Sequence, residues 1–190
     1  MIRHLVFLLE ETSAKVMLEG IVPRLISQEI SVTYIKFNGK QDLDKNVEGK
    51  IRNWQKPDSA FVILRDQDSA ICTDIKQRLK EQCCRTGKKN ILIRIACHEL
   101  ESFYLGELEA VANAYQMQLP NQNSSKFRKP DNLANAAEEL RKITQKRYQK
   151  IDGSRRIAPL LKTDGTNRSH SFNVLCDGIR RIAAGQLRTI

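Results

Sequence analysis

The sequence of 190 residues predicts an α/β fold: a parallel sheet of about four strands flanked by helices, with a mostly helical, basic C-terminal extension. Two observations lead to this prediction. Short apolar runs alternate with longer segments in which apolar residues recur every three or four positions. From Leu119 onwards this alternation stops, and the chain becomes polar and basic. We therefore expect an α/β core over residues 1–118 and a basic, mainly helical subdomain over residues 119–190 that packs on the core.

Four segments have the composition of strands. Residues 2–9 are mostly apolar and end at Glu10, and residues 30–37 alternate and are rich in β-branched and aromatic types. The run from Phe61 to Leu64 leads into Asp66, and residues 91–96 form a fourth apolar run. Apolar runs of this length, separated by helical patterns, are typical of the buried strands of a parallel sheet.

Helical periodicity fills the segments between these strands. The apolar positions run from Val16 to Ile26, with a kink or break expected at Pro23, then from Leu43 to Trp54, from Ile71 to Leu79 and from Phe103 to Tyr115. Beyond a polar loop at 120–130, a charged helix is expected at about 132–148 and a last helix at about 172–184. Between these two helices, the segment 153–156 (Gly-Ser-Arg-Arg) suits a loop that approaches a phosphate closely.

Composition excludes several classes of protein. No apolar run approaches the length of a membrane span, and the apolar start at Leu5 to Leu9 is too short for a signal peptide, so we expect a cytoplasmic protein that is not inserted in a membrane. The five cysteines are odd in number and contain no C-x-x-C, which argues against a disulfide framework and a structural zinc. The three histidines have no ligand spacing, which argues against a zinc enzyme.

The net charge of +10 is concentrated near the C-terminus. Residues 1–125 carry 17 Lys/Arg and 16 Asp/Glu, whereas residues 126–190 carry 15 and 6. This asymmetry indicates a polyanionic partner, with DNA or RNA the first choice and an acidic protein or a membrane surface as the alternatives. The alternative is that the basic excess merely keeps the protein soluble. The expected phosphate contacts are Lys126, Arg128, Lys129, Arg155, Arg156 and Arg168.

Acidic residues follow three of the predicted strands. They are Glu10 and Glu11, Asp66 and Asp68, and Glu99 and Glu101. The carboxyl ends of parallel strands lie at one edge of a sheet, and residues two apart in an extended chain point to the same side. Two carboxylates about 4 Å apart repel by roughly 4 kcal/mol at an effective dielectric near 20. We therefore expect either raised pKa values or a hard cation, Mg²⁺ or Mn²⁺, between them. The alternative is that each acid caps the helix that follows it.

The glutamate after the first strand and the Asp-x-Asp after the third resemble the Toprim domain of topoisomerases, primases and OLD-type nucleases. Over nearly its full length, the chain is similar to the DUF4276 family of bacterial Toprim-like proteins. The segments that carry the resemblance are 9–14 (Leu-Glu-Glu-Thr-Ser-Ala), 64–68 (Leu-Arg-Asp-Gln-Asp), 94–106, which contains Glu-Leu-Glu, and the C-terminal stretches 129–131, 148–150 and 168–172. The resemblance implies a Toprim/Rossmann-like sheet.

The resemblance also implies roles for the acids. Glu10 or Glu11 would be the Toprim glutamate, and Asp66 and Asp68 would bind metal. Glu99 and Glu101 would be further ligands or acid/base groups. The sequence departs from the family at two positions, because Ile71 and Glu107 stand where the family commonly has Asp. Ile71 has no carboxylate, and the side chain of Glu107 is one methylene longer than that of Asp.

These features give a first hypothesis, a Mg²⁺- or Mn²⁺-dependent endonuclease whose catalytic groups are the six acids. Asp66, Asp68 and Glu99 or Glu101 would hold a metal that polarises the phosphate, and Glu10 or Glu11 would bind a second metal or relay a proton. The resemblance further suggests anti-phage defence beside an ABC- or AAA-type ATPase. A second hypothesis, favoured by Ile71, is a non-catalytic subunit that binds nucleic acid or protein. A third is a nucleotidyl- or phosphoryl-transferring enzyme with a small substrate.

Overall fold

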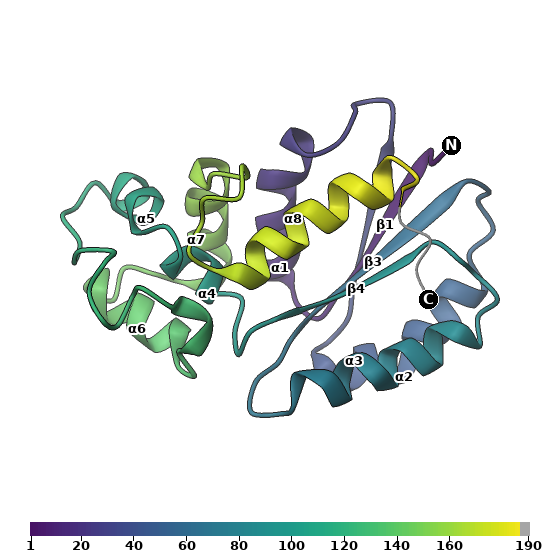
Figure 1. The fold of residues 1–190 in the computed structure, drawn as a ribbon, viewed down its shortest axis with the longest axis horizontal. Helices are drawn as coiled ribbons and strands as arrows, with labels where there is room; N and C mark the ends of the chain where they lie inside the picture. Colours follow the sequence, from purple (N-terminus) through teal and green to yellow (C-terminus); the bar gives the residue numbers. More distant parts are fainter. Residues whose placement is uncertain (187–190) are drawn as a thin grey trace.

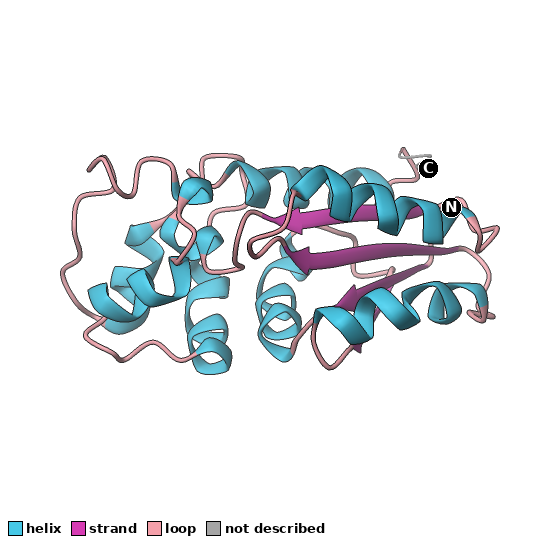
Figure 2. Cartoon of the chain, turned by 90° about the horizontal axis from the view of Figure 1, so that it is seen from below, coloured by secondary structure: helices cyan, strands magenta, loops and turns pink. Residues whose placement is uncertain are grey.

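Four parallel strands form one sheet in the computed structural model, which describes residues 1–186. The strands are β1 (His4–Leu9), β2 (Ser31–Lys36), β3 (Ser59–Asp66) and β4 (Ile91–Ala96), in the order β2-β1-β3-β4. Each neighbouring pair is parallel. In Figure 2 the visible arrows point the same way, toward a group of short helices. The predicted fold class is therefore confirmed.

Helices occupy both faces of this sheet and the space beyond its carboxyl edge (Figure 1). They are α1 (Thr12–Ile21), α2 (Lys40–Arg52), α3 (Cys72–Cys84), α4 (Ser102–Leu105), α5 (Leu108–Tyr115), α6 (Ala136–Ile143), α7 (Lys150–Ile157) and α8 (His170–Ala183), with short 3₁₀ turns η1 (Val22–Arg24), η2 (Pro130–Asn132) and η3 (Ala158–Leu160). Helices α2 and α3 lie on one face, α1 and α8 lie on the other, and α4 to α7 gather past the strand ends.

Alternation along the strands divides the core into two apolar clusters. Leu5 and Phe7 of β1 belong to the cluster that includes α1 and α8, whereas Val6 and Leu8 belong to the one that includes α2 and α3. Successive side chains of a strand point to opposite faces, so a strand buried on both sides must be apolar at nearly every position. The first cluster continues from the sheet into α4, α5, α6 and α7, which ties the helices beyond the strand ends to the core.

Two of the predicted helices are interrupted. The segment from Phe103 to Tyr115 is two helices, because Glu107 between them has a φ of −146° and a ψ of 77°, which lie outside the helical region. The charged helix predicted at 132–148 is shorter, because Gln145 and Lys146 have positive φ angles of 53° and 66°, which a helix cannot continue. By contrast, α1 ends at Ile21, just before the break expected at Pro23.

Two further predictions were wrong in detail. Ile71, placed in the apolar stripe of α3, is the residue before that helix and is 64% exposed. The segment 153–156 is not a loop but lies within α7, where Gly153 is buried against Tyr148. Glycine is required here for close packing rather than for an approach to phosphate. Among residues 1–186, no helix has the length and apolarity needed to cross a bilayer.

Candidate functional site at the carboxyl edge of the sheet

The parallel register brings the acids after β1 and β3 together. Leu9, the last residue of β1, is opposite Leu64 of β3, so Glu10 emerges beside the end of β3. The backbone N–H of Asp66 donates to Glu10 Oε2 at 3.2 Å. Burial raises the pKa of Glu10, and the nearby charge of Asp68 adds to this, while the hydrogen bond from Asp66 opposes it. These two strand ends therefore meet as the sequence predicts.

Asp66 is the most strongly perturbed acid at this edge. Burial raises its pKa well above the usual range, and the negative charges of Glu10, Glu101 and Glu11 raise it further. Within residues 1–186, no hydrogen bond is made to its carboxylate, although Lys150 lies near enough to oppose the shift. A desolvated carboxylate among other acids favours its protonated form or a bound cation.

Glu101 reaches the same region from the start of α4. Its side chain is fully buried, and Oε1 accepts a hydrogen bond from the Tyr148 hydroxyl at 2.8 Å. Its other oxygen, Oε2, is buried without a hydrogen-bond partner in the described chain. Burial raises the pKa of Glu101, while Lys150 and the Tyr148 hydrogen bond oppose the rise. An unpartnered buried carboxylate oxygen is costly, and it is the clearest sign that this site accommodates another group.

Lys150, the first residue of α7, supplies a positive charge to the cluster. Its Nζ lies 3.2 and 3.3 Å from the two carboxylate oxygens of Glu11. Burial lowers the pKa of Lys150, but the charges of Glu101 and Glu11 outweigh burial, so the net shift is upward. Sequence reasoning gave Lys150 no role. The only signal was its place in the segment 148–150, which resembles the DUF4276 family.

Asp68 does not join Asp66, which corrects the expectation that the two carboxylates present themselves to one point. The strand ends at Asp66, and Asp68 has a left-handed φ of 53°, so the alternation of an extended chain no longer applies. Asp68 instead forms an ion pair with Lys40 of α2 at 2.9 Å. It therefore lies on the α2 side of the edge, while Asp66 lies near Glu101 and Lys150.

Glu99 and Glu107 have structural partners. Glu99 Oε2 accepts from the backbone N–H of Ala137 at 2.8 Å, in the first turn of α6. It therefore caps a helix, although not the helix that directly follows it. Glu107 is buried and accepts from the backbone N–H of Lys162 at 2.7 Å. Of the six acids predicted as catalytic, Glu10, Glu11, Asp66 and Glu101 form a central cluster, whereas Asp68 is paired with Lys40 and Glu99 caps α6.

The donor chemistry of the central cluster fits a hard divalent cation. Glu10, Asp66 and Glu101 offer only carboxylate oxygens, and one of these oxygens is buried and unpartnered. In the described residues, however, no three acidic, histidine or cysteine side chains already converge closely enough to hold an ion. Binding would therefore require at least one of the three carboxylates to rotate.

The predicted phosphate contacts divide into paired and unpaired residues. Lys126 forms an ion pair with Glu139, and Arg156 forms one with Asp152. Arg168 donates a hydrogen bond to the side chain of Asn123. Arg128, Lys129 and Arg155 are exposed, and their side chains have no ion pair or hydrogen bond within residues 1–186. Arg155 and Arg156 lie in the last turn of α7 rather than in a loop.

The fold and this edge define a class of protein: a parallel α/β protein with a carboxylate cluster, and a lysine beside it, at the carboxyl ends of its strands. The chain belongs to the DUF4276 family, described as a domain of unknown function, whose model matches residues 9–180. No curated protein matches it significantly. Among solved structures, it is similar to the C-terminal region of the Burkholderia pseudomallei OLD protein, with 14% identity, a TM-score of 0.49, and coverage of 96% of this chain and 99% of that one.

Proposed function

We propose that this protein is a Mg²⁺- or Mn²⁺-dependent phosphodiesterase that cleaves DNA or RNA. The observation that carries the proposal is the buried, unpartnered Oε2 of Glu101 near the desolvated carboxylate of Asp66. Several acids held together without enough positive charge would gain stability from a hard cation. Such a cation can polarise a phosphoryl oxygen and so promote the hydrolysis of a phosphodiester.

Glu10, Asp66 and Glu101 would hold the metal, which supplies a Lewis acid for the scissile phosphate. Lys150 remains protonated because the neighbouring acids raise its pKa, so its ammonium group would bind a phosphate oxygen. Glu11, which now pairs with Lys150, would accept a proton from the attacking water when the lysine turns to the phosphate. Asp68, in the loop after β3, and Glu99, in the loop after β4, would orient these two loops rather than bind the metal.

The basic residues would hold the nucleic acid backbone without reading its sequence. Arg128, Lys129 and Arg155 are the best candidates, because they are exposed and lack other partners in the described chain. Lys126, Arg156 and Arg168 would first have to leave the partners they have. Neutralising one residue that binds a phosphate should reduce the slope of log K against log salt by about 0.7–0.9.

The wider setting is supported by the sequence resemblance alone. We propose a cytoplasmic role in anti-phage defence beside an ABC- or AAA-type ATPase, with residues 1–118 as the catalytic core and residues 119–190 as the basic subdomain. Co-expression with a candidate ATPase, followed by purification of a stable complex, would test this part of the proposal separately from catalysis.

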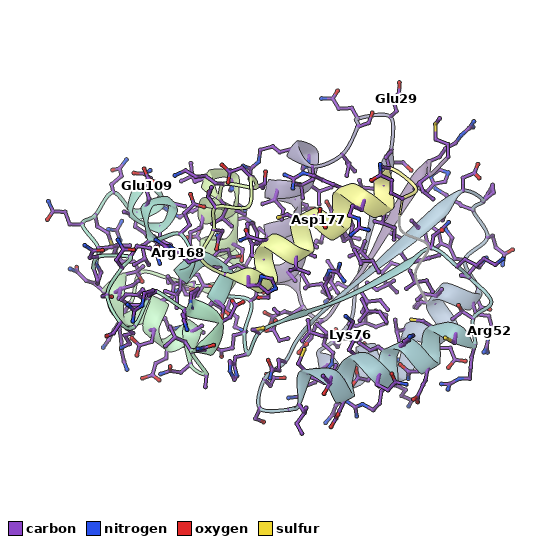
Figure 3. The ribbon with its side chains drawn as sticks, viewed as in Figure 1. Glu29, Arg52, Lys76, Glu109, Arg168 and Asp177 are labelled. Carbon is purple, nitrogen blue, oxygen red and sulfur yellow. The ribbon has the colours of Figure 1, made fainter. Side chains whose placement is uncertain are left out.

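The metal and the cleavage reaction are tested together by replacing Asp66. Wild type, Asp66→Asn and the control Glu29→Gln, on an exposed loop (Figure 3), are incubated with plasmid, single-stranded DNA and RNA, with Mn²⁺ or with a chelator. We expect Mn²⁺-dependent cleavage by wild type and the control only. Mn²⁺ should also raise the Tm of these two proteins but not that of Asp66→Asn. Mn²⁺ binding that survives in Asp66→Asn would contradict the site.

A second candidate, a non-catalytic subunit that binds nucleic acid, is favoured by specific observations. Asp68 is paired with Lys40, Glu99 caps α6, and Ile71 stands exposed where the family commonly has Asp. This candidate predicts salt-dependent binding of DNA or RNA that is independent of Mn²⁺ and of Asp66. Binding without cleavage in the experiment above would select it.

A further inference from the structure

A polar hollow lies at the opposite end of the sheet from the carboxylate site, where strands β3 and β4 begin. Its volume is about 230 Å³, and it lies between the loop after α2 and the loop after α3. Its lining includes Trp54, Lys56, Ser59, Phe61, Lys88 and Lys89. Ser59, which lines the hollow, lies seven residues before Asp66 on β3, a distance of roughly 23 Å at about 3.3 Å per residue. The hollow therefore cannot be part of the carboxylate site.

The residues that line the hollow carry a net positive charge. Three lysines line it, and the one acidic residue among its lining residues is Asp58, whose charge is opposed by Arg3 at 4.0 Å. Lys88 Nζ donates to the backbone oxygen of Trp54 at 3.1 Å, which holds that ammonium at the wall. Lys56 and Lys89 have no ion pair within residues 1–186. Lysine ammonium groups gathered in this way attract a phosphate.

An aromatic ring in a fixed position stands beside these lysines. The indole N–H of Trp54 donates to Ser59 Oγ at 2.8 Å, and the ring meets Phe61 edge-on at a centroid distance of 6.2 Å. Trp54 is only half-buried, and it is the single tryptophan of the chain. A partly exposed, immobilised indole provides a surface on which a nucleobase can stack. Positive charge and an aromatic surface therefore occur together in one hollow.

We propose that this hollow binds a nucleoside monophosphate, with its phosphate among Lys56, Lys88 and Lys89 and its base against Trp54. The volume of about 230 Å³ is below the usual range of ligand pockets, about 300–1,000 Å³, which favours one nucleotide unit over a larger ligand. In Figure 3, Arg52 at the end of α2 and Arg168 lie on opposite sides of the molecule along its long axis. Because the hollow and Asp66 lie at opposite ends of β3, the hollow can be occupied without the carboxylate site.

The single tryptophan gives a direct test by NMR. Its indole N–H gives one cross-peak, which is followed while AMP is added to the ¹⁵N-labelled full-length protein in the presence of a chelator. We expect a saturable shift that inorganic phosphate reverses by competition. Adenosine, which lacks the phosphate, should bind at least about tenfold more weakly. The double variant Lys56→Ala/Lys89→Ala should also bind AMP about tenfold more weakly, whereas Lys76→Ala, on the exposed surface of α3, should match wild type.

Three results would overturn the proposal. They are an indole cross-peak that millimolar AMP does not move, an equally weakened affinity in Lys76→Ala, and a shift seen with a single-stranded oligonucleotide but not with AMP. The last result would assign the hollow to a nucleic acid strand instead. Tm values for the variants show whether each variant is folded. If the double variant does not fold, the competition between AMP and phosphate for the wild-type protein still tests whether the hollow binds the nucleotide.

Discussion

A single methyl group added at Gly153 should destabilise the protein because the glycine lies against the ring of Tyr148. A Cβ at this position would be under 3.0 Å from two ring carbons of Tyr148 and 3.2 Å from the Tyr115 hydroxyl. Tyr148 is 1% exposed, so its ring can move only by displacing other core residues. Its movement would also break the 2.8 Å hydrogen bond to Glu101, whose second oxygen already lacks a partner.

The magnitude follows from these contacts. Overpacking of a core costs about 1–3 kcal/mol, and a buried group that loses its hydrogen bond costs about 1–3 kcal/mol more. Replacement of a helical glycine by alanine increases the unfolding free energy by up to about 1 kcal/mol. We therefore expect Gly153→Ala to lose roughly 3 kcal/mol of unfolding free energy, which lowers the Tm of a chain of this size by about 6–12 °C.

The assay is urea denaturation and thermal melting of wild type, Gly153→Ala and a matched control, Gly49→Ala. Gly49 is also helical, in α2, but a Cβ there would meet nothing within 4 Å. The control should gain about 0.4–1 kcal/mol from its lower backbone entropy in the unfolded chain. Opposite signs for the two variants would support the reasoning. A Gly153→Ala variant as stable as the control would refute it, because Tyr148 would then have room to move without cost.

Two further predictions concern pH. Tyr148→Phe removes the hydrogen bond that lowers the pKa of Glu101. The variant should therefore lose little unfolding free energy near pH 4, where Glu101 is protonated, and about 1–3 kcal/mol near pH 8. An equal loss at both pH values would contradict this. The folded-state pKa of Asp66 is raised above its unfolded value of 3.8, so ionisation destabilises the folded protein as pH rises above that value. With chelator present, Asp66→Asn should therefore unfold at higher urea than wild type near pH 8 and at the same urea near pH 3, and a more stable wild type near pH 8 would contradict the assignment.

The sheet was predictable because its signal in the sequence is local, although the pairing of its strands is not. Short apolar runs such as Phe61 to Leu64 that alternate with helical stripes are typical of strands buried on both faces of a parallel sheet, and the stripes supply the cover. The family resemblance was also readable from the sequence, and the match over residues 9–180 confirms it. The helix break at Glu107 was not predictable, because this residue leaves the helical region and binds the backbone N–H of Lys162, which is distant in the sequence.

The central site was predictable only in part. Glu10 and Asp66 could be placed together because a parallel sheet puts their strand ends side by side. Asp68 was misplaced because its direction depends on one left-handed residue after the strand, which the spacing alone does not reveal. Lys150 was missed because a lysine at the start of a charged helix is usually solvated, and only the packing of α7 against α1 brings it to Glu11.

By itself, the sequence determined the class of fold, the family and the edge of the sheet at which acidic side chains collect, because each depends on the order of apolar and acidic residues along strands. The tertiary structure alone decided which of these acids face one another, that Lys150 lies between them and that Glu101 is buried with an unpartnered oxygen. The reason is that side-chain partners beyond a strand end are set by loop dihedral angles and by helices from other parts of the chain, and these are fixed only when the whole molecule packs.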